Sequence, residues 1–392
     1  MTDSLPRSLL DHLCGRQEEM VALLRDLALA ESPTSDPATQ DAVFDRLAAA
    51  LTAAGCRVRR LRGRTSGGQL WAVQGRRGRG RKPRRMQLLI GHGDTVWPVG
   101  TLASMPVEVR DGRLTGPGTF DMKAGLVQGI FALAALRELG LEPEVVPAFF
   151  INSDEEVGSP DSTARICRLA RCAERVFVLE PSLGPEGRLK TGRKGIGHFV
   201  VTVRGRAAHA GLDPEKGVSA ILELAHVIQK IHALTDMERG ITLNVGVISG
   251  GTRPNVVAAE ARGEIDVRVL HEEDAAEVER AIRAIRPTTP GTNLEITGVM
   301  GKPPLAPNPR NRALWHTAER CAAALGLALG EGTVGGASDG NTTSQFAATL
   351  DGLGAVGDGA HAVHEFVEVA RMPERAALLA MLLLEPAGAA VD

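Results

Sequence analysis

Apolar positions in the first half of the chain follow two different spacings. Residues 14–30 and 41–55 place them at helical intervals, and residues 122–140 form a third and longer helical run. Residues 145–152 (VVPAFFIN) and 176–179 (VFVL) are instead short apolar runs, which predict strands in a sheet covered on both faces. Strands that alternate with helices in this way favour an α/β domain.

The pattern changes near residue 195 and then reverts. Alternating strands and amphipathic helices follow one another in the order βαββαβ, which is typical of a small ferredoxin-like sandwich. The runs that carry this order are 197–205, 217–234, 242–251, 256–270, 272–285 and 292–300. The proline-rich run PPLAPNP (303–309) then predicts a return linker, after which helices and strands alternate as in the first part.

The chain is therefore predicted to contain two domains, and its 392 residues exceed the length of one typical domain. We expect a discontinuous α/β domain with a mixed sheet, made of residues 1–192 and 303–392. An inserted ferredoxin-like domain would occupy residues 193–302. The Asp-Gly pair at 111–112 lies between alternating residues and predicts a hairpin.

Composition excludes several classes of function. A net charge of −2 gives no overall field that attracts nucleic acid, and no run of about 18 apolar residues offers a membrane span. The N-terminal residues contain no apolar segment of signal length, so we expect a cytoplasmic protein. Five scattered cysteines do not resemble a disulfide framework and are interpreted as buried free thiols.

One basic run departs from this balance. Residues 75–85 (GRRGRGRKPRR) hold seven basic residues without interleaved aromatic ones, between two strand-like segments. This favours an exposed, solvated hairpin tip. Contact with an anionic partner such as nucleic acid is the alternative, and it rests on this run alone.

Three segments combine turns with residues that bind metals. His92 and Asp94 follow an apolar strand, where an imidazole can bind a metal while a carboxylate fixes its tautomer. Asp121 follows a glycine-rich loop at the start of the long helix, and Asp154, Glu155 and Glu156 follow the apolar strand 145–152. Taken singly, they are equally compatible with a structural histidine, a helix N-cap and a solvated acidic loop. Three adjacent acids repel one another, and a cation or a proton would relieve that repulsion.

Two further segments complete the set. Glu180 follows the apolar strand 176–179, and the run 358–367 (DGAHAVHEFV) contains His361, His364 and Glu365. Together the five segments supply several imidazoles and carboxylates at strand ends of one α/β sheet, where such folds place their sites. This donor set suits two zinc ions that share a carboxylate, and cobalt or manganese would also fit.

The order of these motifs resembles one known family. The series HxD, GxGxxDxK, DEExG, LEP and GxHxxxE is similar to the di-zinc amidohydrolases that include glutamate carboxypeptidases, aminoacylases and succinyl-diaminopimelate desuccinylase. The resemblance covers nearly the whole chain and is closest to the glutamate carboxypeptidase branch. It implies a zinc hydrolase that cuts an amide bond next to a free carboxylate. Its substrate would be a small peptide or an N-acyl amino acid, and the enzyme would be a homodimer.

The resemblance also implies a role for each residue of the metal site. His92 and Glu180 would hold one zinc, Glu156 and His361 the other, and Asp121 would bridge them. Asp94 would orient His92, and Glu155 would act as the general base that carries a proton to the leaving amine. The family further implies a cis peptide bond between Asp121 and Met122.

Three residues of the inserted domain match substrate-contact segments of the family. His209, in AAHAG, would stabilise the oxyanion, often from the partner subunit, and Asn255, in RPNVVAA, would assist it. Arg268, in DVRV, would grip the substrate carboxylate with its planar fork. The residue pattern alone is as compatible with a surface arginine. The loop 335–341 (GGASDGN) resembles the glycine-rich loop near that carboxylate.

Two other functions remain open at this stage. The first is an amidase or N-acyl-amino-acid deacylase that acts on another small acyl or aryl amide. The second is a binding protein that keeps the metal site without the chemistry, and the intact Glu155 argues against it because a pure binder needs only the ligands.

Overall fold

The computed structural model describes residues 4–75 and 86–388, which form two compact units. Unit 1 comprises residues 1–191, 307–333 and 338–392, and unit 2 comprises residues 192–306 and 334–337. For comparison, the sequence predicts that the inserted domain begins at residue 193 and ends at residue 302. The basic run at 76–85 lies outside the described residues.

The first unit contains most of the helices and strands. Its helices are α1 (Ser4–Cys14), α2 (Gln17–Leu29), α3 (Asp41–Ala53), α4 (Ala124–Glu138), α5 (Thr163–Cys172), α8 (Pro309–Ala324), α9 (Asp339–Thr343) and α10 (Met372–Leu384). Its main sheet has the order β1-β2-β6-β3-β7-β14. These strands are β1 (Cys56–Leu61), β2 (Gln69–Gln74), β6 (Val146–Asn152), β3 (Met86–His92), β7 (Ala173–Val178) and β14 (Ala348–Leu350).

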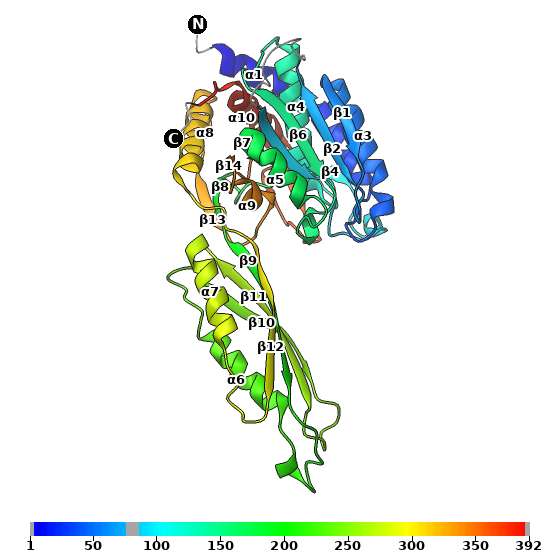
Figure 1. Cartoon of the computed structure of the whole chain (residues 1–392). Helices are drawn as coiled ribbons and strands as arrows, with labels where there is room; N and C mark the ends of the chain where they lie inside the picture. Colours follow the sequence, from blue (N-terminus) through cyan, green and yellow to red (C-terminus); the bar gives the residue numbers. More distant parts are fainter. Residues whose placement is uncertain (1–3, 76–85, 389–392) are drawn as a thin grey trace. The chain divides into compact units, whose positions relative to one another are not determined.

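The main sheet is mixed, as expected from the sequence. Strand β3 runs parallel to both β6 and β7, and β14 runs parallel to β7. Strands β1 and β2 continue the sheet antiparallel to one another and to β6. The parallel strands β6, β3 and β7 therefore end side by side at one end of the sheet; β6 and β7, which flank β3, are labelled in Figure 1.

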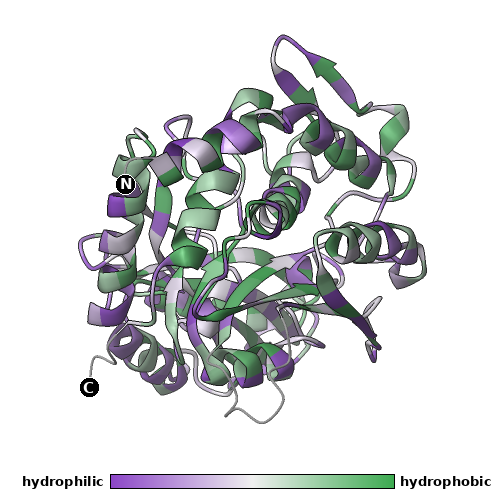
Figure 2. Ribbon diagram, turned by 90° about the horizontal axis from the view of Figure 1, so that it is seen from above, coloured by the Kyte–Doolittle hydropathy of each residue, from purple (hydrophilic) through white to green (hydrophobic). Residues whose placement is uncertain are grey.

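Both faces of this sheet are covered, and successive residues of a strand face opposite cores. In β3, Leu89 packs with the helices α1, α2, α4 and α10, whereas Leu88 and Ile90 pack with Ile166 of α5 on the other face. Phe149 and Phe150 of β6 divide in the same way. Figure 2 shows central strands of hydrophobic colour among helices that also carry hydrophilic positions. This explains why the strands appear in the sequence as unbroken apolar runs.

Smaller sheets complete unit 1 and its connections. A four-stranded sheet has the order β15-β16-β5-β4, with β4 (Glu108–Arg110) and β5 (Arg113–Thr115) joined by the predicted Asp-Gly turn. Its other strands are β15 (Gly357–Asp358) and β16 (Phe366–Glu368). Strands β8 (Leu189–Arg193) and β13 (Glu331–Val334) pair where the chain passes from one unit to the other.

Unit 2 has the predicted βαββαβ order. Its elements are β9 (Gly195–Arg204), α6 (Ala220–His232), β10 (Thr242–Gly250), β11 (Glu260–Val269), α7 (Glu272–Ala284) and β12 (Asn293–Lys302). The strands form an antiparallel sheet in the order β10-β11-β9-β12, and both helices pack on one face of it (Figure 1). Strand β10 therefore lies at one edge of this sheet, with one side unpaired within unit 2.

Two expectations from composition need correction. The stretch Thr119–Glu138 does have the length and mean hydropathy of a membrane span, but 94% of its most apolar 18-residue window is buried inside the protein, as in a core helix. All five cysteines are free, as expected, yet only Cys56 and Cys321 are buried. Cys14 and Cys172 are exposed, so they do not fill the core.

Helix α4 approaches the sheet so closely that only glycine fits at one position. A Cβ atom on Gly125 would lie 2.0 Å from the backbone carbonyl oxygen of Leu179. Every residue from Ala124 to Leu136 is buried, so the helix has little freedom to move away. Gly125 thus sets the distance between the helix that follows Asp121 and the strand that precedes Glu180.

We predict that Gly125→Ala lowers the free energy of unfolding by about 1–3 kcal/mol, because overpacking outweighs the gain of about 1 kcal/mol in helix propensity. Gly129→Ala in the same helix is the matched control, since its Cβ would meet only side-chain atoms, at 2.8 Å and beyond. Urea unfolding of both variants measures the difference. A Gly125→Ala protein at least as stable as the wild type would contradict this account.

Candidate metal centre

Three of the predicted ligands follow the adjacent parallel strands of the main sheet. His92 ends β3, Glu180 comes two residues after β7, and Glu156 lies in a short turn after β6. The β-ladder pairs His92 with Asn152, the last residue of β6, so the strand ends lie at one level. The sheet itself therefore brings these side chains together.

The other two ligands come from loops on different elements. Asp121 lies in the turn Thr119–Lys123 before α4 in a non-helical conformation, and Lys123 occupies the N-cap position of α4, so Asp121 is not a helix N-cap. The peptide bond between Asp121 and Met122 is cis, as predicted. His361 lies between β15 and β16 and has a φ of 61°, in the left-handed region.

The five side chains form two groups that share Asp121. One group joins His92, Asp121 and Glu180, and the other joins Asp121, Glu156 and His361. Within each group the potential ligand atoms all lie within 4.8 Å of one another. The structure thus brings together all five residues that the sequence assigned to the metal site.

The two oxygens of Asp121 face different groups. Oδ1 lies 3.3 Å from Nε2 of His92, and Oδ2 lies 3.5 Å from Nε2 of His361. His92 Nε2 is also 3.6 Å from Glu180 Oε1, and His361 Nε2 is 3.1 Å from Glu156 Oε2. Oδ1 of Asp121 is buried and accepts no hydrogen bond. A buried carboxylate oxygen without a donor fits a bound cation, so these residues suit a metal pair with one bridging ligand.

The charges around Asp121 change the ionisation of the site. Burial would raise the pKa of Asp121, but the imidazoles of His361 and His92 that face it hold it well below its usual range. The same contacts with Asp121 and Glu156 raise the pKa of His361 to about 10. Burial, in contrast, raises the pKa of Glu156. In the metal-free protein, protons on the imidazoles thus balance the carboxylates.

Asp94 contacts the His92 ring and also the acidic turn. His92 Nδ1 lies 3.0 Å from the backbone oxygen of Asp94 and 3.5 Å from its carboxylate. The carboxylate accepts a hydrogen bond from Thr34 Oγ1 at 2.7 Å and longer ones from the N–H groups of Glu155 and Glu156, at 3.4 and 3.3 Å. Asp94 therefore connects the loop of His92 to the turn that carries both glutamates.

The three adjacent acids do not share one environment. The Asp154 carboxylate turns away and accepts the N–H groups of Asp161 and Ser162 at 2.7 and 3.1 Å, before α5. Glu156 faces His361, and the partly buried Glu155 precedes it in the turn. The chain thus relieves the repulsion expected among three acids by giving Asp154 and Glu156 separate partners.

Glu365 is a structural support of the site that the sequence did not assign. Its buried carboxylate accepts the N–H groups of Gly118 (2.9 Å), Phe120 (2.8 Å) and Asp121 (3.0 Å), and the indole N–H of Trp97 (3.0 Å). Burial raises the pKa of Glu365 to about 7. The sequence did contain a signal, because Glu365 belongs to the GxHxxxE motif that supplies His361.

The three residues predicted in the inserted domain separate into two places. His209 and Asn255 lie together in exposed loops, joined by a bridge between His209 and Val256 and a 3.0 Å hydrogen bond from Ala210 N to Asn255 O. Arg268 lies at the other end of β11, where Asp266 accepts hydrogen bonds from its Nε and Nη2 at 2.8 and 2.9 Å. Within unit 2 the structure does not bring Arg268 to His209.

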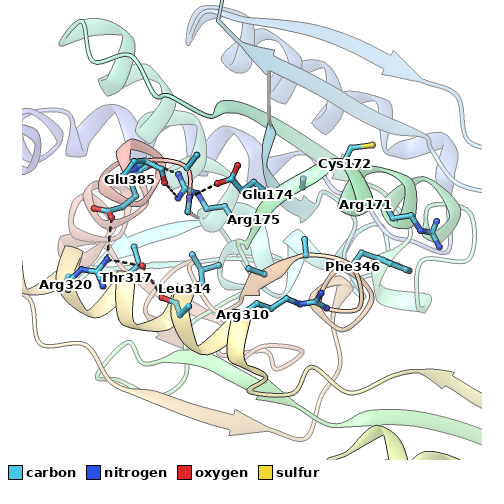
Figure 3. A pocket seen from close by; sticks show the side chains of 17 residues that line it. Arg171, Cys172, Glu174, Arg175, Arg310, Leu314, Thr317, Arg320, Phe346 and Glu385 are labelled. Carbon is cyan, nitrogen blue, oxygen red and sulfur yellow. Dashed lines mark hydrogen bonds and ion pairs between the residues drawn. The ribbon is translucent and has the colours of Figure 1, made fainter. Parts of the chain in front are cut away.

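A cavity elsewhere in unit 1 contains none of these residues. Its volume is about 670 Å³, and it opens beside the start of β7, at the opposite end of that strand from Glu180 (Figure 3). Arginines predominate among its charged residues. Arg175 donates hydrogen bonds to the side chain of Gln87 and to the backbone oxygens of Glu385 and Pro386. The guanidinium group of Arg171 stacks on the ring of Phe346. These contacts account for both arginines as structural residues.

We predict that Glu365→Gln disrupts the Asp121 loop although the side chains are nearly isosteric. All four groups around the carboxylate are N–H donors, so an amide NH₂ at either position would face two of them. A buried donor left unpaired costs about 1–3 kcal/mol. Thermal unfolding and zinc titration should both show a loss. Asp358→Asn, which changes an exposed carboxylate of β15, is the control, and equal behaviour of the two variants would contradict the prediction.

Comparisons with known proteins agree with this architecture. Residues 191–293 match the family model of a peptidase dimerisation domain. Carboxypeptidase G2 of Pseudomonas sp. is 28% identical over 303 residues, covering 76% of this chain and 73% of that protein. Succinyl-diaminopimelate desuccinylase of Dechloromonas aromatica is 28% identical over 320 residues, covering 75% of this chain and 81% of the relative.

Solved structures show the same fold over nearly the whole chain. Aminopeptidase PepT of Bacillus cereus aligns with a TM-score of 0.76 and 23% identity, over 94% of this chain and 98% of that one. The M20 family metallo-carboxypeptidase Sso-CP2 of Sulfolobus solfataricus aligns with a TM-score of 0.69 and 17% identity, again over 94% and 98%. Taken with the two sequence relatives and the matched M20 dimerisation domain, these findings show that the chain is similar to M20 peptidases and amidohydrolases over most of its length, and they indicate a hydrolase that acts on amide bonds.

Proposed function

We propose that this chain is a zinc-dependent hydrolase that cleaves an amide bond next to a free carboxylate, as its relative carboxypeptidase G2 suggests. The observation that carries the proposal is the pair of ligand groups that share Asp121, with Glu155 adjoining Glu156 at their edge. When bound, two divalent cations would polarise the scissile carbonyl and make a bound water more acidic. Zinc suits the mixed imidazole and carboxylate donors, and cobalt or manganese would also fit.

The residues of this chain would divide the remaining work. His92, Asp121, Glu156, Glu180 and His361 would hold the cations. Glu155, one residue before a ligand, would accept a proton from the attacking water and deliver it to the leaving amine. Arg268 would bind the substrate carboxylate, because its planar fork matches two carboxylate oxygens.

A second function differs only in which side of the amide is recognised. An N-acyl-amino-acid deacylase would use the same metal centre, and the relative named as a succinyl-diaminopimelate desuccinylase favours that alternative. A series of N-acyl glutamates and peptides with C-terminal glutamate, each compared with its α-carboxamide and with other acyl groups, separates the two. Strong preference for the free α-carboxylate, lost in Arg268→Ala, together with tolerance of different acyl groups supports the first function. Equal hydrolysis of acids and carboxamides would overturn it.

We further propose that the enzyme acts as a homodimer. Strand β11 has 10 residues and is therefore about 30 Å long, which separates Arg268 from His209 by more than the size of a small substrate. If both contact one substrate, they must come from different chains. Exposed apolar side chains on α6 and on the edge strand β10 offer an interface for a second copy: Ile221, Leu222, Val247 and Ile248.

Metal binding should release protons. The pKa of His361 is about 10 in the metal-free protein, so at pH 7–8 its imidazole carries a proton that a cation must displace. Zinc affinity should therefore rise with pH, by about tenfold per unit for each proton released. Calorimetry in two buffers of different ionisation enthalpy measures the number of protons released. Identical heats in both buffers would show that His361 is not a ligand.

The two adjacent glutamates should respond differently to the same substitution. Glu155→Gln should keep both cations and lose about 100- to 10,000-fold in kcat, because a positioned acid–base group is removed. Glu156→Gln should weaken one cation, and excess zinc should restore part of its activity. Elemental analysis and kcat of both variants decide the matter. A Glu155→Gln enzyme with normal turnover would refute the proposed mechanism.

The dimer hypothesis predicts complementation between inactive variants. In a heterodimer of His209→Ala and Glu155→Gln chains, one site has an intact Glu155 and receives His209 from its neighbour. Co-expression should thus restore about a quarter of wild-type activity, from half heterodimers with one working site each. Glu155→Gln mixed with Glu156→Gln is the control, because neither site is then complete. Recovery equal to this control would place His209 in its own chain's site or outside catalysis.

A further inference from the structure

A buried carboxylate outside the metal ligands holds both ends of the acidic turn. Asp339, the first residue of α9, is only 3% exposed. Its Oδ2 accepts a hydrogen bond from Asn152 Nδ2 at 2.7 Å, and its Oδ1 accepts one from Ser159 Oγ at 2.5 Å. Asn152 and Ser159 are both fully buried. The three side chains therefore form one buried polar cluster.

The two partners of Asp339 lie at the two ends of the acidic turn. Asn152 is the last residue of β6, and Ser159 follows immediately after the turn that carries Glu155 and Glu156. Only residues 153–158 lie between the two hydrogen-bonded side chains. Asp339 comes from a segment more than 175 residues further along the chain, with separations of 187 and 180 residues from its two partners. One carboxylate thus fixes the distance across the base of this turn.

The cluster also reaches the other half of the metal centre. Asn152 pairs with His92 in the ladder between β6 and β3, and its carbonyl oxygen accepts the N–H of Gly93 at 2.9 Å. A displacement of Asn152 would therefore move the acidic turn relative to His92. Asp154 also holds the start of the turn, by accepting the N–H group of Asp161 at 2.7 Å, whereas the hydrogen bonds from the N–H groups of Glu155 and Glu156 to Asp94 are 3.3–3.4 Å long.

We propose that Asp339 is a positioning residue for the hydrolytic centre. By linking Asn152 to Ser159 through hydrogen bonds, Asp339 orients the turn that carries Glu155 and Glu156. The inference rests on the proposed function for the roles of the two glutamates. Small displacements of a catalytic group cost up to about 100-fold in rate, and loss of a residue that supports a metal ligand typically costs about 10- to 100-fold in metal affinity.

The variants Ser159→Ala and Asp339→Ala remove one and both of these hydrogen bonds. Ser159→Ala should lower kcat by about 10-fold and Asp339→Ala by about 100-fold, with KM changed less than threefold. Zinc titration of the metal-free proteins should show that one of two sites weakens by about 10-fold or more in Asp339→Ala while the other is unchanged. The weakened site should be the one lost in Glu156→Gln.

Asp339→Asn should restore part of the lost kcat. Its amide oxygen can still accept from Asn152, and its NH₂ group can donate to the hydroxyl oxygen of Ser159. A role in stability alone predicts no such ordering of kcat among folded variants, provided that each is assayed well below its unfolding temperature.

Asn311→Ala is the matched control. Asn311 is buried in α8, and its Oδ1 accepts a hydrogen bond from Thr349 N at 2.8 Å, so its loss also leaves a buried polar group unpaired. It should lose stability while kcat and both zinc affinities stay near wild type. If Asn311→Ala loses as much kcat as Ser159→Ala, or if Ser159→Ala keeps normal kcat and normal zinc binding, Asp339 is not a positioning residue. Should wild-type protein cleave none of the amides tested, the proposed function fails, and zinc titration still decides the role of Asp339.

Discussion

The carboxylate of Asp121 is the interaction on which the site depends. Its two oxygens face two separate groups, so His92 and Glu180 must converge on one side while Glu156 and His361 converge on the other. A single carboxylate can reach both groups only if the turn before α4 is held at a fixed distance from the strand ends that carry the other ligands. Much of the architecture of unit 1 meets this requirement.

Two constraints fix that distance. Gly125 lets α4 approach the backbone of Leu179, and Glu365 gathers the N–H groups of the turn from the opposite side. A buried carboxylate is costly unless it is fully hydrogen-bonded, and here four donors surround it. Asp94 and Asp339 act similarly on the acidic turn. Buried acids that bind no cation thus surround the acids proposed to bind one, each satisfied by N–H or O–H donors.

Unit 2 is organised by a different requirement. Its helices cover one face of the sheet, and apolar residues remain exposed on α6 and on the edge strand β10. His209 and Asn255 lie at one end of this sheet and Arg268 at the other, although the sequence treated them as parts of one substrate site. Because a ten-residue strand separates them, these residues can contact one small substrate only if they come from two different chains. This is the basis of the hypothesis that two chains share one site.

The sequence by itself determined the elements and the candidate ligand set of this protein. The apolar spacing of the strands, the βαββαβ order and the five ligands at strand ends or turns are local patterns, which residues near one another in the chain specify. The tertiary structure alone decided which groups satisfy the buried acids. Glu365 and Asp339 find their donors 180 to 268 residues away, and whether Asp121 caps a helix or joins two ligand groups depends on loops that only folding brings together. Such pairings leave no periodic trace in the sequence, because a hydrogen bond between distant loops constrains single residues rather than a run of them.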